Sequence, residues 1–199
     1  MLTTLWQAAA PGPVVEAELL PLSNQGRLRV TYNWLYSALN CDAADASSFV
    51  WVLHKLDEQH VALSPKNGYA GRTLYASVRD DWNYYVQVQA PHSADWITGV
   101  GRDEILTLST ADFFVRLQGF NGRYLSVTAT ADDHGGHRGC RVMSTAPAPD
   151  AASTWLLRPT LSLQARLQLP PLPSAAELQQ ALSRLGQSVP EATLASLLG

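Results

Sequence analysis

The sequence predicts an all-β domain followed by a short α-helical tail, and three observations support this. Short runs of alternating apolar and polar residues recur along the chain between turn-forming residues, as in an all-β sandwich or barrel. Phe113–Val127 places two such runs around Asn121-Gly122, and Asn-Gly in this setting is the strongest local sign of a β-hairpin. No long segment before residue 173 shows the i, i+3, i+4, i+7 apolar spacing of an amphipathic helix.

The composition narrows the class of protein further. Hydrophobic residues make up 46% of the chain and charged residues only 16%, which argues against disorder. The formal net charge is −3 and the basic residues form no obvious cluster, so we expect no nucleic-acid binding. No apolar run approaches the ~18 residues that span a bilayer, and the N-terminus lacks the pattern of a secretory signal. We therefore expect a cytoplasmic protein, with signal-independent release as the alternative.

The expected strands follow one another closely from the N-terminus. Val14–Leu20 forms the first and Leu28–Tyr32 the second, with a turn at Ser23–Gly26 between them, and Cys41–Ser48 is expected to be a loop. Further strands are expected at Phe49–Leu53, His60–Leu63, Thr73–Val78, Tyr84–Val88, Trp96–Val100, Ile105–Leu108, Phe113–Leu117, Arg123–Val127, Arg141–Ser144 and Trp155–Leu157. Strands this short and this numerous favour a closed or layered all-β domain.

A weak internal repeat refines the architecture. Four aromatic residues follow a small or polar lead-in and are expected to open apolar strands: Trp6, Phe49, Phe113 and Trp155. Two of the intervals between them are roughly 40 residues, and the middle one is longer, as an insertion would make it. Three units of about four strands each are the plan of a β-trefoil.

Phe113–Val127 also resembles the repeat of fascin-like and related β-trefoils. Their units run as an aromatic strand, a short turn, an Asn-Gly-basic-aromatic-Leu cassette and a later aromatic strand. Gly26–Val30 matches this cassette only weakly in the first unit, and the second unit lacks the cassette. The chain also lacks the Gln-x-Trp signature of ricin-type sugar-binding trefoils. The resemblance implies a trefoil over about residues 1–160 and a lectin-like or protein-binding role. It also allows a protease inhibitor, a scaffold or the receptor-binding component of a toxin.

The composition changes after Trp155. Pro159 and the run Pro170–Pro173 predict a linker or strap over residues 161–173. Ser174 and Glu177 have the spacing of a capping box, which predicts a two-helix tail over residues 174–199. The apolar positions of this tail are Leu178, Leu182, Leu185, Leu194, Leu197 and Leu198. Because helices this short are marginal alone, these leucines are expected to bind a partner or a second copy of the chain. The alternative is that they pack on the trefoil.

One set of residues predicts a carbohydrate site. Aromatic rings stack on sugar rings, and a neighbouring carboxylate accepts hydrogen bonds from sugar hydroxyls. The predicted ligand-binding residues are Trp82, Tyr85, Asp95, Trp96 and Asn121. Strand alternation places Tyr84 in the core and Tyr85 on the opposite side. The alternative is that these aromatics fill the core of the trefoil.

The chain contains two cysteines, Cys41 and Cys140, and the second follows a Gly-rich loop. His134, His137 and Cys140 lie at three-residue spacing and are soft ligands that could hold Zn²⁺. The alternative is a polar hairpin loop after which Cys140 opens a strand. A single disulfide is an alternative to the two free thiols that we expect in a reducing cytosol.

Motifs for catalysis are missing from the sequence. It contains no Gly-x-Ser-x-Gly elbow, no phosphate-binding glycine loop and no His-Glu-x-x-His helix. The adjacent carboxylates Asp80-Asp81 and Asp132-Asp133 are expected in solvated turns. We therefore predict a non-catalytic binding module for carbohydrate, with a protein–protein interaction module as the alternative.

Overall fold

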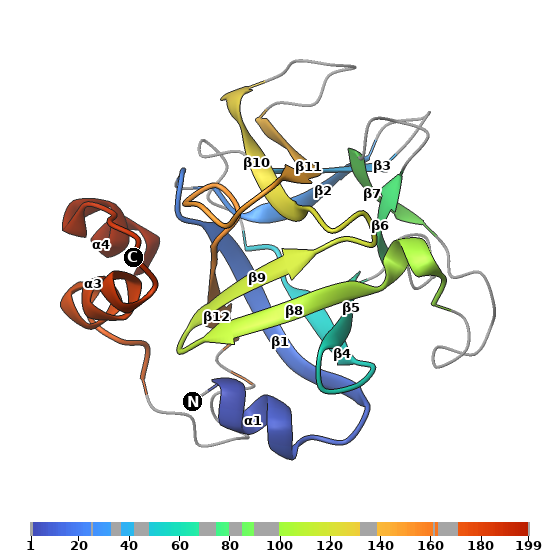
Figure 1. Ribbon diagram of the computed structural model, residues 1–199, viewed down its shortest axis with the longest axis horizontal. Helices are drawn as coiled ribbons and strands as arrows, with labels where there is room; N and C mark the ends of the chain where they lie inside the picture. The colour runs from blue at the N-terminus through green and yellow to red at the C-terminus, as the bar shows by residue number, and fades with distance from the viewer. Residues whose placement is uncertain are drawn as a thin grey trace.

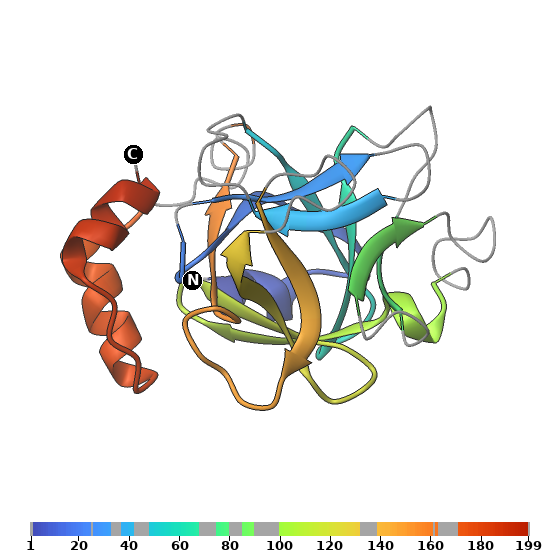
Figure 2. The same cartoon turned by 90° about the horizontal axis from the view of Figure 1, so that it is seen from above.

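A barrel of antiparallel strands carries three β-hairpins at one end and a pair of helices on its side in the computed structural model (Figures 1 and 2). The structure describes residues 2–24, 26–32, 37–41, 48–67, 75–79, 85–89, 100–131, 139–160, 162 and 171–198. Its elements are α1 (Leu2–Ala8), β1 (Gly12–Pro21), β2 (Leu28–Tyr32), β3 (Ser37–Cys41), β4 (Trp51–Lys55), β5 (His60–Pro65), β6 (Tyr75–Arg79), β7 (Tyr85–Gln89), the 3₁₀ helix η1 (Arg102–Glu104), β8 (Leu106–Ala111), β9 (Phe114–Gln118), β10 (Tyr124–Ala131), β11 (Cys140–Ala146), β12 (Trp155–Pro159), α3 (Ala175–Arg184) and α4 (Glu191–Leu198).

The barrel closes through six antiparallel pairings among the described strands. β1 pairs with β4, β4 with β5, β5 with β8, β8 with β9, β9 with β12, and β12 returns to β1. The hairpins β2–β3, β6–β7 and β10–β11 meet one another at one end of this barrel. Each third of the chain thus supplies two barrel strands and one hairpin. The all-β prediction and the β-trefoil architecture are confirmed.

The strand register identifies equivalent positions in the three units. Trp51 opens β4 and pairs with Ala17, Leu106 opens β8 and pairs with Val61, and Trp155 opens β12 and pairs with Val115. All three first residues of these strands are completely buried in the core. The three residues occupy equivalent positions in the barrel core, and two of the three are tryptophans.

Of the four aromatic residues expected to open strands, only Trp155 does so. Trp6 lies in α1, Phe49 precedes β4 by two residues, and Phe113 precedes β9 by one. Leu5 and Trp6 of α1 both pack on the barrel core, and Trp6 is only 3% exposed. Regular intervals alone did not distinguish these places.

Two further strand predictions differ from the structure. Cys41 ends β3 instead of opening a loop, and its strand pairs with β2 over the five register pairs from Leu28–Cys41 to Tyr32–Ser37. The missed strand residue Cys41 belongs to the barrel core, since Leu39 and Cys41 are at most 1% exposed. The strand expected at Trp96–Val100 falls largely outside the described residues, and Val100 itself is not in a strand.

The helical tail packs on its own barrel. Ser174 caps α3 as predicted, because its Oγ accepts a hydrogen bond from Glu177 N at 3.3 Å and its N–H donates to Glu177 Oε2 at 2.7 Å. At the other end Gly186 adopts φ +69°, the conformation that ends helices. Both helices lie along one side of the barrel (Figure 2). Among the described helices none is long and apolar enough to cross a bilayer.

The predicted partner-docking role of the tail leucines was wrong. Leu178, Leu182, Leu194 and Leu197 are each at most 1% exposed, and Leu185 packs against them. They form one cluster with Leu20, Leu22, Phe114 and Leu156 of the trefoil. Arg158 on β12 also donates to the carbonyl of Leu197 at 3.3 Å. The barrel therefore provides the apolar surface that the helices need, and these side chains are not available to a partner.

Candidate functional site

The predicted ligand-binding residues fall partly outside the described structure. Trp82, Asp95 and Trp96 lie outside it, as do the predicted metal ligands His134 and His137. The backbone of Tyr85 opens β7, where it pairs with Arg79 and Met143. Asn121 lies in the β9–β10 turn, so the site is built from this turn and its neighbours.

The β9–β10 turn, Gly119–Arg123, is held by its own backbone. Gly119 N donates to Arg123 O at 2.9 Å, and Gly122 N donates to Gly119 O at 3.0 Å. Gly122 has φ +71°, which explains the glycine of the Asn-Gly pair. Gln118 Nε2 adds a hydrogen bond to Gly122 O at 2.8 Å. The hairpin turn predicted from Asn121-Gly122 is present.

Asn121 fastens this turn to β11. Its Nδ2 donates to Ser144 O at 2.8 Å, and its Oδ1 accepts from Ser144 Oγ at 2.9 Å and from Arg123 N at 3.0 Å. Ser144 Oγ also lies 2.9 Å from the Arg123 carbonyl, and Ser144 is completely buried. The Asn121 oxygen is thus fully used by the chain itself. Its position indicates that it supports the turn, whereas the sequence predicted a contact with a ligand.

The rigid turn presents Phe120 beside η1. The guanidinium carbon of Arg102 lies 4.2 Å from the centroid of the Phe120 ring, within the range of a cation–π contact. Arg102 Nε is 3.6 Å from Asp103 Oδ1, and these two side chains are 69% and 30% exposed. We call Arg102, Asp103 and Phe120 the Phe120 surface. It combines an aromatic ring, a planar donor and a carboxylate acceptor.

A buried carboxylate fixes the other side of this surface. Glu104 is completely buried and its Oε2 accepts a hydrogen bond from Gly101 N at 2.6 Å. The Glu104 N–H in turn donates to Gly101 O at 3.0 Å. Burial and the nearby Glu104 charge raise the pKa of Tyr75 on β6. The backbone that carries Arg102 and Asp103 is therefore anchored to the core.

The Phe120 surface lies beside β6. A Cβ built on Gly119 would lie 3.0 Å from Val78 Cγ2 of β6, and η1 packs beside β6 (Figure 1). Residues 80–84, with Trp82, connect β6 to β7; residues 90–99, with Asp95 and Trp96, lead from β7 towards η1. The sequence analysis did not single out Phe120, although an aromatic residue in a turn between Gly119 and Gly122 is a recognisable sequence feature.

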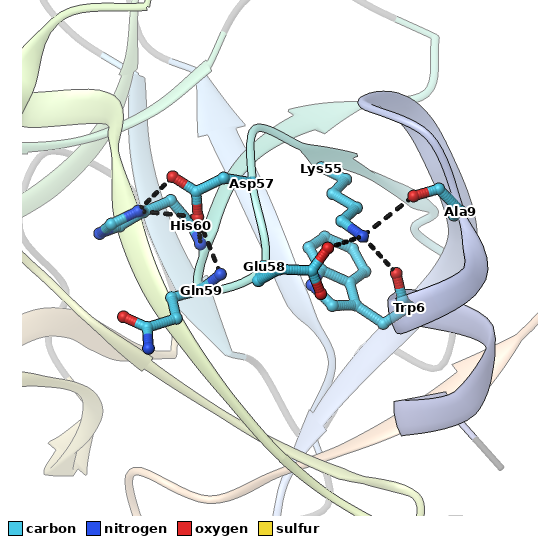
Figure 3. Close-up of polar contacts among 7 residues, drawn as sticks. All are labelled: Trp6, Ala9, Lys55, Asp57, Glu58, Gln59 and His60. Carbon is cyan, nitrogen blue, oxygen red and sulfur yellow. Dashed lines mark hydrogen bonds and ion pairs between the residues drawn. The ribbon is translucent and has the colours of Figure 1, made fainter.

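A second polar cluster lies around the β4–β5 turn (Figure 3). The Lys55 side chain is 2% exposed, and its Nζ donates to Trp6 O at 2.7 Å, Ala9 O at 2.9 Å and Glu58 Oε1 at 2.8 Å. Lys55 thus caps the C-terminal carbonyls of α1 and holds this helix on the barrel. The exposed Asp57 accepts hydrogen bonds from His60, which lower the pKa of Asp57. The arrangement of Lys55 is structural, since all its donors are used.

One hydrogen-bonded pair resembles part of a hydrolase site. His54 Nε2 lies 2.7 Å from Ser64 Oγ, and burial lowers the pKa of His54 to about 4. Ser64 is only 3% exposed and the Tyr75 ring packs at 5.4 Å from that of His54. A nucleophile must reach its substrate, and this hydroxyl is enclosed. The pair stabilises the β4–β5 layer of the barrel.

The predicted metal site can be followed only at Cys140. This residue opens β11, as the hairpin-loop alternative has it, and its register partner on β3 is Cys41. The two cysteines are not joined by a disulfide in this structure. No group of three His, Cys, Asp or Glu side chains within the described ranges could hold a metal ion. The ligand role of His134 and His137 stays a prediction.

Comparison with known proteins finds similar solved structures at low sequence identity. No family model matches the chain, and no curated protein matches it. The designed threefold-symmetric protein ThreeFoil is similar in structure, with TM-score 0.54 and 13% identity over 72% of this chain and 97% of that one. Cry35Ab1 matches with TM-score 0.53 and 15% identity over 80% of this chain and 38% of its own. The Polyporus squamosus lectin, solved with Neu5Acα2-6Galβ1-4GlcNAc, matches with TM-score 0.50 and 13% identity over 75% of this chain and 50% of its own. These likenesses support a β-trefoil.

Proposed function

We propose that the chain is a non-catalytic binding module for carbohydrate. The observation that carries the proposal is the Arg102–Phe120 contact, presented on a hydrogen-bonded turn beside β6. In the sequence Trp82 follows β6, and Asp95 and Trp96 follow β7. A rigid turn loses little conformational entropy when a ligand binds. The resemblance to lectin-like trefoils, one of which was solved with a sialylated glycan, supports the ligand class.

The chemistry of the Phe120 surface suits a hydroxyl-rich ligand. Phe120 offers an aromatic ring face to the C–H groups of a sugar, and the Arg102 guanidinium donates to ring and hydroxyl oxygens. Asp103 accepts hydrogen bonds from sugar hydroxyls, as Asp95 would on the neighbouring segment. In this proposal Trp82, Tyr85 and Trp96 extend the aromatic surface of the same site, and Asn121 holds Phe120 in place.

A glycan array with the full chain tests the proposal. The wild type is expected to bind a defined family of glycans, and the double variant Trp82→Ala/Trp96→Ala to lose that binding while its far-UV and near-UV circular dichroism keep the trefoil signature. Acrylamide quenching of the wild type should reach a fraction of the tryptophan fluorescence, and a bound glycan should protect it. An array without binders, together with tryptophans that resist the quencher, would overturn the proposal. Capture of protein partners in place of glycans would favour the interaction-module alternative.

A further inference from the structure

Cys41 and Cys140 are direct partners on antiparallel strands of two different hairpins. Cys41 ends β3, Cys140 begins β11, and the register pairs their Cα atoms. Directly opposite residues have Cα atoms about 4.5 or 5.5 Å apart and side chains on the same side of the sheet. Both separations lie within the range of about 4.4–6.8 Å that a disulfide spans without backbone movement.

The two thiols differ in their surroundings. Cys41 is 1% exposed and belongs to the barrel core, between Leu28 on β2 and Cys140 on β11. Cys140 is partly exposed and packs against the same core. Burial, and then the neighbouring Cys140 thiol, raises the pKa of Cys41. A reagent in solution therefore meets Cys140 first, while Cys41 stays protonated beneath it.

We propose that Cys41 and Cys140 form a reversible dithiol–disulfide pair whose oxidant is a low-molecular-weight disulfide such as glutathione disulfide. The Cys140 thiolate attacks one sulfur of the oxidant, forms a mixed disulfide and releases one glutathione thiolate. The Cys41 thiol then loses its proton and attacks Cys140 Sγ, which releases the second glutathione. Two protein thiols become one disulfide, and the two electrons and two protons leave with two molecules of reduced glutathione.

The bond would fasten the first unit to the third at the hairpin end of the barrel. Among the described residues, β3 and β11 share only the register pairs Cys41–Cys140 and Asn40–Arg141. The β6–β7 hairpin meets these strands at one register pair each, Ala38–Gln87 and Tyr85–Met143. A covalent bond at this narrow seam closes a loop of roughly 100 residues and restricts the unfolded chain. Oxidation should therefore raise the melting temperature markedly.

The test uses the full chain, incubated with glutathione buffers of increasing oxidised fraction and quenched with acid. The intact mass is expected to fall by two hydrogens with no retained glutathione. Trypsin should release Val30–Lys55 joined to Gly139–Arg141, since cleavage sites flank both peptides. The melting temperature should rise by about 5–10 °C and return to its starting value with a reductant.

Single variants test the order of the two steps. Cys41→Ser should accumulate the mixed disulfide on Cys140, whereas Cys140→Ser should leave Cys41 unmodified until the protein is denatured. Two thiols that stay free, or that each retain glutathione, in the oxidised wild type would overturn the proposal. So would disulfide-linked dimers, or stoichiometric zinc that protects both thiols until it is chelated. The wild-type measurement decides the matter even if a variant fails to fold.

Discussion

Trp51 and Trp155 make the same hydrogen bond in two different units of the barrel. The indole Nε1 of Trp51 donates to Leu28 O at 2.7 Å, and that of Trp155 donates to Leu125 O at 3.3 Å. Each tryptophan opens the fourth strand of its unit, and each carbonyl belongs to the first strand of the same unit's hairpin. In each unit this hydrogen bond joins a barrel strand to a hairpin strand and gives a buried backbone carbonyl a hydrogen-bond partner. The equivalent place in the second unit holds Leu106.

The buried ammonium of Lys55 should be essential for the attachment of α1. Lys55→Met removes the donor to Trp6 O and Ala9 O, and we expect a loss of about 2–3 kcal/mol in the free energy of unfolding. Lys66→Met is the matched control, because the Lys66 ammonium pairs with Glu16 at 2.7 Å on the surface, with side chains 40% and 24% exposed. It should cost less than about 1 kcal/mol. Urea denaturation of both variants measures the difference, and equal losses would contradict the structural role of Lys55.

The leucines of the tail should contribute to stability and not to assembly. Leu182→Ala and Leu194→Ala each empty a fully buried site between helix and barrel, and each should cost about 2–5 kcal/mol. Leu198→Ala, at a partly buried position, should cost less. Urea denaturation gives the stability and sedimentation velocity gives the oligomeric state. A change in oligomeric state with unchanged stability would restore the partner-docking interpretation.

His54 should make the protein less stable as the pH falls below neutrality. Burial lowers its pKa from 6.5 to about 4, so between these values the unfolded chain binds a proton that the folded chain does not. Stability is complete above pH 6.5 and declines towards pH 4. Because the ring is partly exposed, we expect the wild type to lose about 1–2 kcal/mol between pH 7 and pH 5.

The variant His54→Gln isolates this contribution. Glutamine retains a side-chain nitrogen that can donate to Ser64 and has no charge to gain. Urea denaturation at pH 7 and pH 5 measures the stability that each protein loses between these values. The variant should lose about 1–2 kcal/mol less than the wild type. Parallel pH dependences of the two proteins would show that His54 is not the group responsible.

The two glycines of the β9–β10 turn should differ in their tolerance of alanine. A Cβ at Gly119 would lie 2.7 Å from the buried Ser144 Oγ, so Gly119→Ala should break the Asn121–Ser144 contacts at about 2–3 kcal/mol. At Gly122 a Cβ meets nothing within 4 Å, and the cost comes only from φ +71°, about 1 kcal/mol. Thermal unfolding of the two variants compares them. A larger cost at Gly122 would contradict the close packing of the turn on β11.

Most of the fold could be predicted because alternation and turn chemistry are local signals. Phe113–Val127 predicted its hairpin, since Asn121 and Gly122 determine a turn whatever surrounds them. The capping box at Ser174 and Glu177 likewise predicted the start of α3. The partners of these elements are not local. Nothing near Cys41 predicts that β11 will pair with β3, and nothing near Trp6 predicts that a lysine on β4 will cap its helix.

The candidate site was predicted only in part for the same reason. The Asn121-Gly122 turn was expected, but the contact of Phe120 with Arg102 joins two units of the trefoil and leaves no mark in either segment. Asn121 was predicted to bind a ligand, but its side chain hydrogen-bonds Ser144 on β11, which lies 23 residues away in the sequence. The leucines of α3 and α4 showed that the helices must pack on something. Only the packed chain shows that they pack on its own barrel.

The most direct test of the proposed function compares two arginines of similar exposure. Arg102 and Arg184 are 69% and 65% exposed, and each lies 3.6 Å from an aspartate, but only Arg102 contacts Phe120. Isothermal titration with a glycan identified on the array should give at least about a tenfold weaker affinity for Arg102→Ala than for the wild type. Arg184→Ala, on α3, should bind as the wild type does. Unchanged affinity in Arg102→Ala, or equal loss in both variants, would contradict a carbohydrate site at the Phe120 surface.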